Sequence, residues 1–291
     1  VLDATGRLTA FVSATGEKLW VSGDNTSNLH LRSQARPVNV GDRYLAVGQS
    51  GGKVQIISQL NGAVVAELRV GNPSGANSLE RVADVSSTPL VLGDKLYSTA
   101  YKGGLVEFSF ATNSPGARLA YHSSRDLAFD DEVFVITGDN GHVYCLSRRD
   151  FHEIWENGSL TYRNVTAPAI YGNYAVVGDL DGYVYFMNLA DGHIDAMLDT
   201  DGEPIHTAPL VAGGDLLIQG ADGELTCLRY DPSFAAAKAE AARVELESSG
   251  YYANLGGGEG DLGIYGSGAQ SLEQLNARRA QAEKVAREIA A

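Results

Sequence analysis

The sequence predicts an all-β fold, a β-propeller made of four-stranded antiparallel blades. Two observations predict it. Residues 165–198 contain four short apolar runs separated by turn residues, and a glycine motif recurs about every forty residues along the chain. A period near forty with four strands in each period is typical of propeller blades. An array of β-sandwiches is the alternative that this pattern leaves open.

The stretch 165–198 defines the predicted blade. Its expected strands are residues 169–171, 174–177, 183–187 and 193–198. They are separated by Gly-Asn and Asp-Gly pairs, which supply the positive φ angles that two-residue hairpin turns need. Short runs rich in aromatic and β-branched residues fit strands rather than helices.

The glycine motif, Gly-x-Leu or Gly-x-Val, marks the same point of each predicted blade. Successive motifs are separated by 46, 52, 37, 41 and 41 residues. They start at Gly6, Gly52, Gly104, Gly141, Gly182 and Gly223. A proline opens an apolar strand ahead of most of them, at Pro37, Pro89, Pro168 and Pro209. No Trp-Asp dipeptide occurs, which argues against the WD-repeat class.

Counted from these motifs, the chain begins inside a blade that we expect to lack its first strand and half of its second. Four complete blades follow, starting near Arg36, Thr88, Arg125 and Thr166. A final half-blade runs from Thr207 to Tyr230. A propeller ring usually closes by completing a split blade, so we expect the C-terminal part of a longer protein, with its propeller over residues 1–232.

Composition argues against two classes of partner. The formal net charge is −14, whereas contacts with nucleic-acid phosphates need clustered Lys and Arg. No run approaches the roughly twenty apolar residues of a membrane helix. Cys145 and Cys227 each follow a glycine motif by four residues. We expect them to be small buried residues on corresponding strands, too far apart for a disulfide.

Residues 10–20, Ala-Phe-Val-Ser-Ala-Thr-Gly-Glu-Lys-Leu-Trp, narrow the subclass. They are similar to the repeat Ala-x-Asp-x-x-Thr-Gly-x-x-x-Trp of quinoprotein-like (PQQ-type) propellers, with Val12 in place of the Asp. Residues 145–155 are a looser copy. In that repeat the Trp closes the outer strand and packs between blades. We therefore expect Trp20 and Trp155 to be packing residues rather than residues that stack on a ligand.

Longer segments, residues 28–33, 81–89, 176–185 and 216–223, resemble the BamB family. The resemblance covers about residues 1–230. It implies an eight-bladed propeller, about five blades of which are present. The propeller would lie on the periplasmic face of the bacterial outer membrane, held by an N-terminal lipid anchor absent from this fragment.

The same resemblance implies a function. The chain would be a non-enzymatic scaffold of the outer-membrane β-barrel assembly machinery, the BAM complex. It would dock the POTRA domains of BamA and support the insertion of outer-membrane proteins. Nascent outer-membrane proteins would be a further partner.

Two connections between blades match the docking region of the family. The first contains Leu29, Leu31 and Arg32, and the second contains Asp84. In an extended segment the two leucines face the same way, and exposed leucines beside an Arg resemble a protein-docking patch. Two alternatives stay open: the leucines are buried at the start of the next strand, or Asp84 caps a turn. Ser86 replaces a second acidic residue common in the family, which weakens the acidic half of the patch.

We expect no catalytic residue, cofactor or metal site. Quinoprotein dehydrogenases of this architecture hold a quinone with calcium and commonly a vicinal cysteine pair, and no adjacent cysteines occur here. Residues 179–182 begin like a calcium loop but have Ala190 in place of its Glu, which favours a hairpin turn. Residues 152–156 resemble a zinc-protease motif, with Glu156 in place of the second His. A quinoprotein dehydrogenase fragment and a ligand-sensing periplasmic propeller are the alternative functions.

The pattern changes after Tyr230. Residues 231–233, Asp-Pro-Ser, are a helix start signal, and residues 234–248 are rich in Ala and Glu. Residues 250–270 contain eight glycines and predict a flexible linker. Residues 271–274, Ser-Leu-Glu-Gln, form a capping box that opens a helix to the C-terminus. We expect a tail of helix, linker and helix over residues 233–291, which departs from the family pattern.

Overall fold

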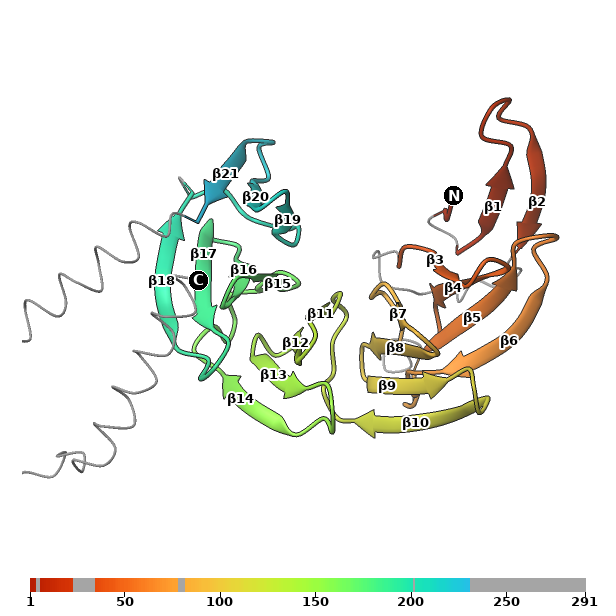
Figure 1. The fold of residues 1–291 in the computed structure, drawn as a ribbon, viewed down its shortest axis with the longest axis horizontal. Helices are drawn as coiled ribbons and strands as arrows, with labels where there is room; N and C mark the ends of the chain where they lie inside the picture. The colour runs from red at the N-terminus through yellow and green to blue at the C-terminus, as the bar shows by residue number, and fades with distance from the viewer. Residues whose placement is uncertain (4–5, 23–34, 78–81, 201, 231–291) are drawn as a thin grey trace, which may run out of the picture. The chain divides into compact units, whose positions relative to one another are not determined.

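The computed structural model describes residues 1–3, 6–22, 35–77, 82–200 and 202–230. The chain divides into two compact units, Val1–Leu228 and Arg229–Ala291. All regular secondary structure in the described residues is strand (Figure 1). Within these ranges no helix is long and apolar enough to cross a membrane. The predicted tail, residues 233–291, lies outside the described residues, and its helices and its boundary stay predictions.

Four sheets have four antiparallel strands each, connected as meanders, and they match the four predicted complete blades. The first comprises β3 (Val38–Val40), β4 (Tyr44–Gln49), β5 (Lys53–Ser58) and β6 (Val64–Arg69). The second comprises β7 (Leu90–Leu92), β8 (Lys95–Ala100), β9 (Gly104–Ser109) and β10 (Ser114–Leu119). The third comprises β11 (Ala128–Phe129), β12 (Val133–Thr137), β13 (Val143–Ser147) and β14 (Glu153–Asn157). The fourth comprises β15 (Ala169–Tyr171), β16 (Tyr174–Gly178), β17 (Tyr183–Asn188) and β18 (Ile194–Asp199).

Two further sheets have fewer strands. β1 (Leu8–Phe11) pairs with β2 (Lys18–Ser22), and Leu2 forms an isolated bridge with Leu8. The glycine motif precedes or opens the third strand of every complete sheet, and Gly6 precedes β1. β1 and β2 are therefore the third and fourth strands of their blade. β19 (Leu210–Ala212), β20 (Asp215–Gln219) and β21 (Leu225–Arg229) form the last sheet. It has three strands, one more than half a blade.

The fourth complete sheet follows the predicted blade nearly residue for residue. The predicted strands differ from β15–β18 by at most one residue at either end. The turn glycines Gly172, Gly182 and Gly192 have φ angles of 57°, 83° and 71°. These left-handed angles are the ones that tight hairpin turns need and that glycine adopts without steric cost.

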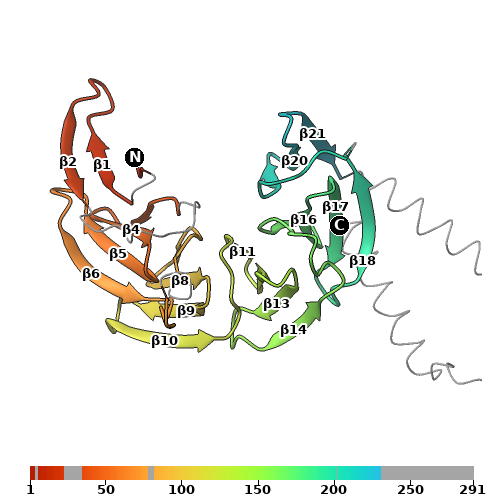
Figure 2. The ribbon, with the colours of Figure 1, turned by 180° about the vertical axis from the view of Figure 1, so that it is seen from behind.

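Successive sheets pack face to face, and an apolar cluster lies between each sheet and the next. The first strands lie toward one side, where β3 contacts β7, β11 contacts β15 and β15 contacts β19. The fourth strands β6, β10, β14 and β18 lie on the other side (Figures 1 and 2). Asp126, just before β11, links the starts of three sheets. Its carboxylate accepts a hydrogen bond from Thr88 N, just before β7, at 2.6 Å, and it pairs with Arg36 Nη2, just before β3, at 3.3 Å. This arrangement is a β-propeller, as predicted.

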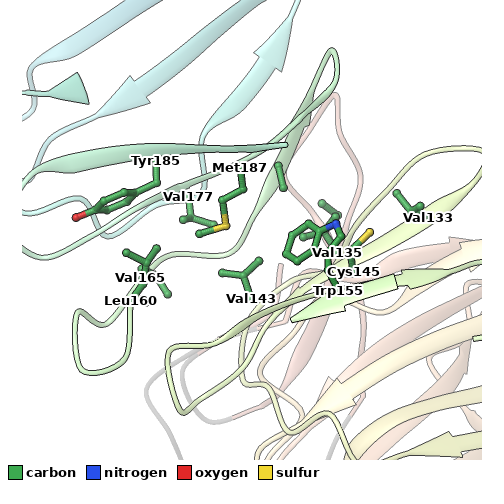
Figure 3. Close-up of a cluster of buried hydrophobic side chains, with 12 residues drawn as sticks. Val133, Val135, Val143, Cys145, Trp155, Leu160, Val165, Val177, Tyr185 and Met187 are labelled. Carbon is green, nitrogen blue, oxygen red and sulfur yellow. The ribbon is translucent and has the colours of Figure 1, made fainter. Parts of the chain in front are cut away.

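The cluster between the third and fourth complete sheets shows how the faces meet (Figure 3). One sheet contributes Val143, Cys145 and Trp155, and the next contributes Val177 and Met187. These side chains alternate along their strands with residues of the opposite face, because successive side chains of a strand point to opposite sides. Each complete blade therefore has two apolar faces, which explains why its strands read as continuous apolar runs.

Both tryptophans pack between blades, as predicted. Trp20 Nε1 donates to the carbonyl of Gln59 at 2.9 Å, and Trp155 Nε1 donates to the carbonyl of Leu189 at 2.8 Å. Each indole thus joins the fourth strand of one sheet to the turn between the third and fourth strands of the next.

The two cysteines differ in their surroundings, and both are free thiols. Cys145 is fully buried, as predicted, and burial raises its pKa to about 12. Cys227 is exposed on β21, so the prediction of a buried residue was wrong there. The cause is tertiary: the face that holds Cys145 is covered by the following sheet, and β21 belongs to the last sheet described.

Every pairing of a third strand with a fourth strand contains a register shift. In four sheets the shift leaves one extra residue on the fourth strand: Leu19, Val65, Ile154 or Asp195. Such β-bulges increase the local twist and interrupt the row of backbone groups at a sheet edge. The outer strands are therefore irregular edges.

Candidate partner-binding segments

The predicted docking residues lie on connections that join the fourth strand of one sheet to the first strand of the next. Leu29, Leu31 and Arg32 belong to the connection between β2 and β3 and lie outside the described residues. Whether the two leucines are exposed therefore stays a prediction. Asp84 belongs to the connection between β6 and β7, which is described on its C-terminal side from residue 82.

Asp84 is buried, with 4% of its surface exposed. Its Oδ1 accepts a hydrogen bond from Gly51 N, at 2.9 Å, in the turn between β4 and β5. The backbone carbonyl of the same residue accepts from Tyr101 N, at 3.2 Å, in the turn between β8 and β9. Asp84 thus links turns of two neighbouring sheets, which is the turn-capping alternative. Ser86 is buried as well. Contact of Asp84 with a partner stays a prediction.

The hydrogen bond made by the Asp84 carbonyl recurs in other connections. In each, a carbonyl in the connection accepts from a backbone amide in the turn between the second and third strands of the following sheet. The pairs are His122 O with Asp139 N at 3.0 Å, Arg163 O with Leu180 N at 3.3 Å, and Pro204 O with Ala221 N at 2.9 Å. Where a proline opens the next strand, the accepting residue stands five positions before it, as does Arg32 before Pro37. By sequence, Arg32 therefore occupies the same repeat position as Asp84 and Arg163.

Arg163 shows what a cation at this position can do. Its Nε lies 2.5 Å from Asp179 Oδ2, and its Nη2 lies 3.0 Å from Asp181 Oδ2. The guanidinium also lies over the rings of Tyr183 and Tyr185. The hydrogen bond to Asp179 raises the pKa of Arg163. We call this group, from Arg163 to the turn at residues 179–182, the Arg163 clamp.

Asp179 is the fully buried centre of the clamp. Its Oδ2 also accepts from the Tyr185 hydroxyl at 2.8 Å, and its Oδ1 accepts from the backbone amides of Asp181 and Tyr183, both at 2.9 Å. Burial, and next this hydrogen bond, raise the pKa of Tyr185. Both carboxylate oxygens are used in holding a turn, so the structure favours the hairpin reading of residues 179–182 over a calcium loop.

The segment that resembles a zinc-protease motif has the wrong geometry for one. In such motifs the ligands share one face of a helix, whereas Glu153–Asn157 form strand β14. His152 Nδ1 instead lies 2.7 Å from Asp150 Oδ1 on the surface, a contact that lowers the pKa of Asp150 to about 2. Across the described part of the chain, no group of three His, Cys, Asp or Glu side chains could hold a metal ion.

Comparison with known proteins bears on the family of the chain. The family profile described as "Outer membrane protein assembly factor BamB" matches residues 1–157, more than half of the chain. The chain belongs to the BamB family. Its similarity to BamB extends beyond the matched residues, into the last sheet, as the relatives show.

Curated BamB proteins align with about three quarters of this chain. The protein named outer membrane protein assembly factor BamB of Shewanella oneidensis is 33% identical over 225 residues, 77% of this chain and 57% of its own length. The BamB of Yersinia pestis is 29% identical over 220 residues, 76% of this chain and 56% of its own length. The chain thus spans little more than half the length of these relatives. Both are named as assembly factors and not as enzymes.

Solved structures agree with the fold. The crystal structure of BamB from Moraxella catarrhalis matches with a TM-score of 0.74 and 27% identity, covering 79% of this chain and 68% of that one. The computationally designed Ika8 protein matches with a TM-score of 0.54 at 16% identity, which shows the fold alone.

Sequence reasoning missed the Arg163 clamp. The signal was present in the spacing of Arg32, Asp84 and Arg163 to the prolines that follow them. The partners of Arg163 could not be predicted from the sequence, because the clamp joins a connection to a turn 16 residues further along the chain.

Proposed function

We propose that this chain is part of a non-enzymatic scaffold of the outer-membrane β-barrel assembly machinery, which docks the periplasmic POTRA domains of BamA. Membership of the BamB family is the observation that carries the proposal. The propeller fold supports it, since propellers offer many rigidly held connections on one side of their sheets. In this role the chain would support the insertion of outer-membrane proteins and meet them as nascent chains.

The proposed place of action is the periplasmic face of the outer membrane, with a lipid anchor at the N-terminus of the full-length protein. The name shared by the relatives, outer membrane protein assembly factor, supports association with that membrane. Fractionation of cells and mass spectrometry of the mature N-terminus test this part of the proposal. A protein recovered without a lipid, or in the cytoplasm, would contradict it.

The proposed docking site is the connection that contains Leu29, Leu31 and Arg32. Asp84 takes a positioning role in this proposal, because its buried carboxylate fixes the β4–β5 turn from the next connection along the chain. An arginine at the repeat position of Arg163 can bridge two carboxylates, as the clamp shows. We propose that Arg32 offers such charge-assisted hydrogen bonds to a partner carboxylate or carbonyl.

The test is a paired measurement on the full-length protein. We expect the double variant Leu29→Ala/Leu31→Ala to lose roughly thirtyfold in affinity for a POTRA fragment of BamA, because anchors of an interface contribute about 2 kcal/mol or more. Arg32→Glu should weaken binding as well. The melting temperature should stay unchanged, since surface truncations alter stability by only about 0.5 kcal/mol.

A matched control is Leu60→Ala. Leu60 is 89% exposed, in the turn that precedes β6, at the end of the sheet opposite to the connections. Its truncation should change neither affinity nor melting. Unchanged binding by the leucine double variant, together with a loss of about 2–5 kcal/mol in stability, would show that the two leucines are core residues. A quinone chromophore in the purified protein would instead favour the dehydrogenase alternative.

A further inference from the structure

The connection between β14 and β15, residues 158–168, presents one aromatic side chain to solvent. Tyr162 is 98% exposed, the highest value among the large apolar side chains of the described residues. Tyrosine rings are usually at least partly buried, because burial removes a large apolar area from water. The fold instead holds this ring outside.

Tyr162 also has an unusual backbone. Its φ is +68°, and Asn164, two residues on, has a φ of +50°. The left-handed region is disfavoured for residues with a side chain, and less so for Asn than for Tyr. Such angles persist only where the surroundings impose them, and they cluster at binding segments.

The surroundings that impose this conformation are the turns of two sheets. On one side, a Cβ placed on Gly141, in the β12–β13 turn, would lie 3.3 Å from Tyr162 N. On the other side, the Arg163 clamp fastens the next residue to the turn between β16 and β17. Leu160 and Val165, which are 3% and 1% exposed, anchor the connection in the apolar cluster of Figure 3. Tyr162 is therefore presented on a rigid support.

Its neighbours complete a surface that suits a protein partner. Leu180, 37% exposed, donates its amide to the carbonyl of Arg163. Asp181 has a side chain that is 66% exposed. Glu203 is exposed and close by, because its backbone would lie 2.8 Å from a Cβ on Gly182. We call Tyr162, Leu180, Asp181 and Glu203 the Tyr162 patch. Arg163 pairs with Asp181, so Glu203 leaves the rim acidic on balance. Such a surface, apolar at its centre, fits an apolar pocket with basic side chains around it.

The repeat relates this patch to the docking segment. Tyr162 and Arg163 stand six and five residues before Pro168, and Leu31 and Arg32 stand six and five residues before Pro37. Both pairs therefore occupy the same positions in connections of the same kind. Rigid aromatic side chains lose little conformational entropy on binding, and tyrosine is enriched among the residues that dominate interfaces.

We propose that Tyr162 is a second contact of this chain with the POTRA domains of BamA, made by inserting its ring into an apolar pocket with a basic rim. The proposal rests on the proposed function, and it assigns the contact to a different connection from the one that contains Leu31. A partner made of several tandem domains can engage two connections of one propeller at once, which raises its overall affinity.

The experiment compares Tyr162→Asn with Tyr162→Phe in the full-length protein, against a fragment with all POTRA domains of BamA. Asn tolerates the left-handed φ and removes the ring, so we expect an unchanged melting temperature and about a tenfold loss of affinity. Phe keeps the ring and should retain most of the affinity. Leu60→Ala is the control for an exposed apolar side chain elsewhere.

The outcomes separate this inference from the proposed function. If Tyr162→Asn binds like the wild type while Leu29→Ala/Leu31→Ala loses binding, the Tyr162 contact is wrong and the proposed docking site stands. If the wild-type protein does not bind the POTRA fragment, the proposed function fails and this inference with it. A lower melting temperature for Tyr162→Asn would show that Tyr162 stabilises the fold, and would contradict its proposed role as an exposed contact. If Tyr162→Asn loses binding to an unfolded outer-membrane protein but keeps its affinity for the POTRA fragment, the patch binds substrate and the proposal is wrong.

Discussion

The indole of Trp20 lies on Gly62, in the turn between β5 and β6. A Cβ added to Gly62 would meet Trp20 Cε3 at 2.5 Å, which is closer than carbon atoms approach. Trp155 and Gly192 repeat the arrangement two residues before β18, again with 2.5 Å to Cε3. The same contact, an indole packed on a turn glycine, therefore occurs twice, and each time it joins a fourth strand to the next sheet.

The indole, and not only the backbone, demands glycine at these turns. Phe151 takes the corresponding place in the turn between β13 and β14, with a φ of +61° and a hydrogen bond from its amide to Ser147 O at 2.9 Å. Gly62 has a φ of +73° and the same bond, to Ser58 O at 2.9 Å. A large residue can thus adopt the conformation where no tryptophan covers the turn.

Gly62→Ala should destabilise the protein by about 3 kcal/mol, since the methyl group combines a left-handed Ala with overpacking against the indole. Gly16→Ala is the matched control. Gly16 has a φ of +72° in the β1–β2 turn, and nothing described lies within 4 Å of its added Cβ. Gly16→Ala should lower the free energy of unfolding by only about 1 kcal/mol. Denaturant unfolding measures both. In a Trp20→Ala background the two substitutions should become equivalent, and equal costs in the wild type would refute the role of the indole.

The Arg163 clamp predicts a large difference between its two carboxylates. Asp179→Ala leaves the guanidinium, the Tyr185 hydroxyl and two backbone amides without their acceptor, and should cost about 3–5 kcal/mol. Asp181→Ala removes only an exposed ion pair and should cost about 1 kcal/mol or less. Urea titration of the two variants tests the assignment. Comparable losses would mean that Asp179 is not the centre of the clamp.

Stability should decline in alkali. Burial, and then Glu107, raise the pKa of Tyr97 from 10.0 to about 12, and burial raises the pKa of Cys145 from 9.0 to about 12. Below pH 9 both groups are protonated in the folded and the unfolded chain. Above it the unfolded chain releases protons that the folded chain retains, so stability falls between pH 9 and 12. Thermal unfolding across this range measures the decline. Cys145→Ala should delay its onset, and a flat profile would contradict the burial of both groups.

The two thiols should react at very different rates. Cys227 is exposed on the last described sheet and should be labelled at once by a thiol reagent in the folded, isolated chain. Cys145 is fully buried with a raised pKa, so it should react only on unfolding. Mass spectrometry of the labelled peptides identifies each site, with Cys227→Ser as the control. Rapid labelling of two thiols without denaturant would be incompatible with the packed face around Cys145.

Much of the fold could be predicted because its signals are local. The Gly-Asn and Asp-Gly pairs at residues 172–173, 181–182 and 191–192 determine turns over a few residues, and the strands between them were placed within one residue. Burial could not be read in the same way. Cys145 and Cys227 occupy one repeat position, yet only the first is covered by another sheet.

The candidate site was less predictable than the fold. From the sequence Asp84 could be a docking residue or a turn cap, and its hydrogen bond with Gly51, 33 residues earlier, could not be predicted. The exposure of Tyr162 depends on two turns, around Gly141 and Asp179, that hold its connection from both sides. Contacts of this kind arise from the stacking of sheets, which the repeat predicts in outline but not residue by residue.

The bulges on the fourth strands have a consequence for the surroundings in which such a protein is proposed to act. Leu19, Val65 and Ile154 are apolar residues on edges that would otherwise be open to pairing. Unfolded outer-membrane proteins are rich in segments ready to form strands, and a straight edge would recruit them indiscriminately. An outer edge broken at the same place in sheet after sheet cannot act as such a template. The proposed role beside strand-forming segments would therefore run through the connections, because the bulged outer edges would not be extended by such segments.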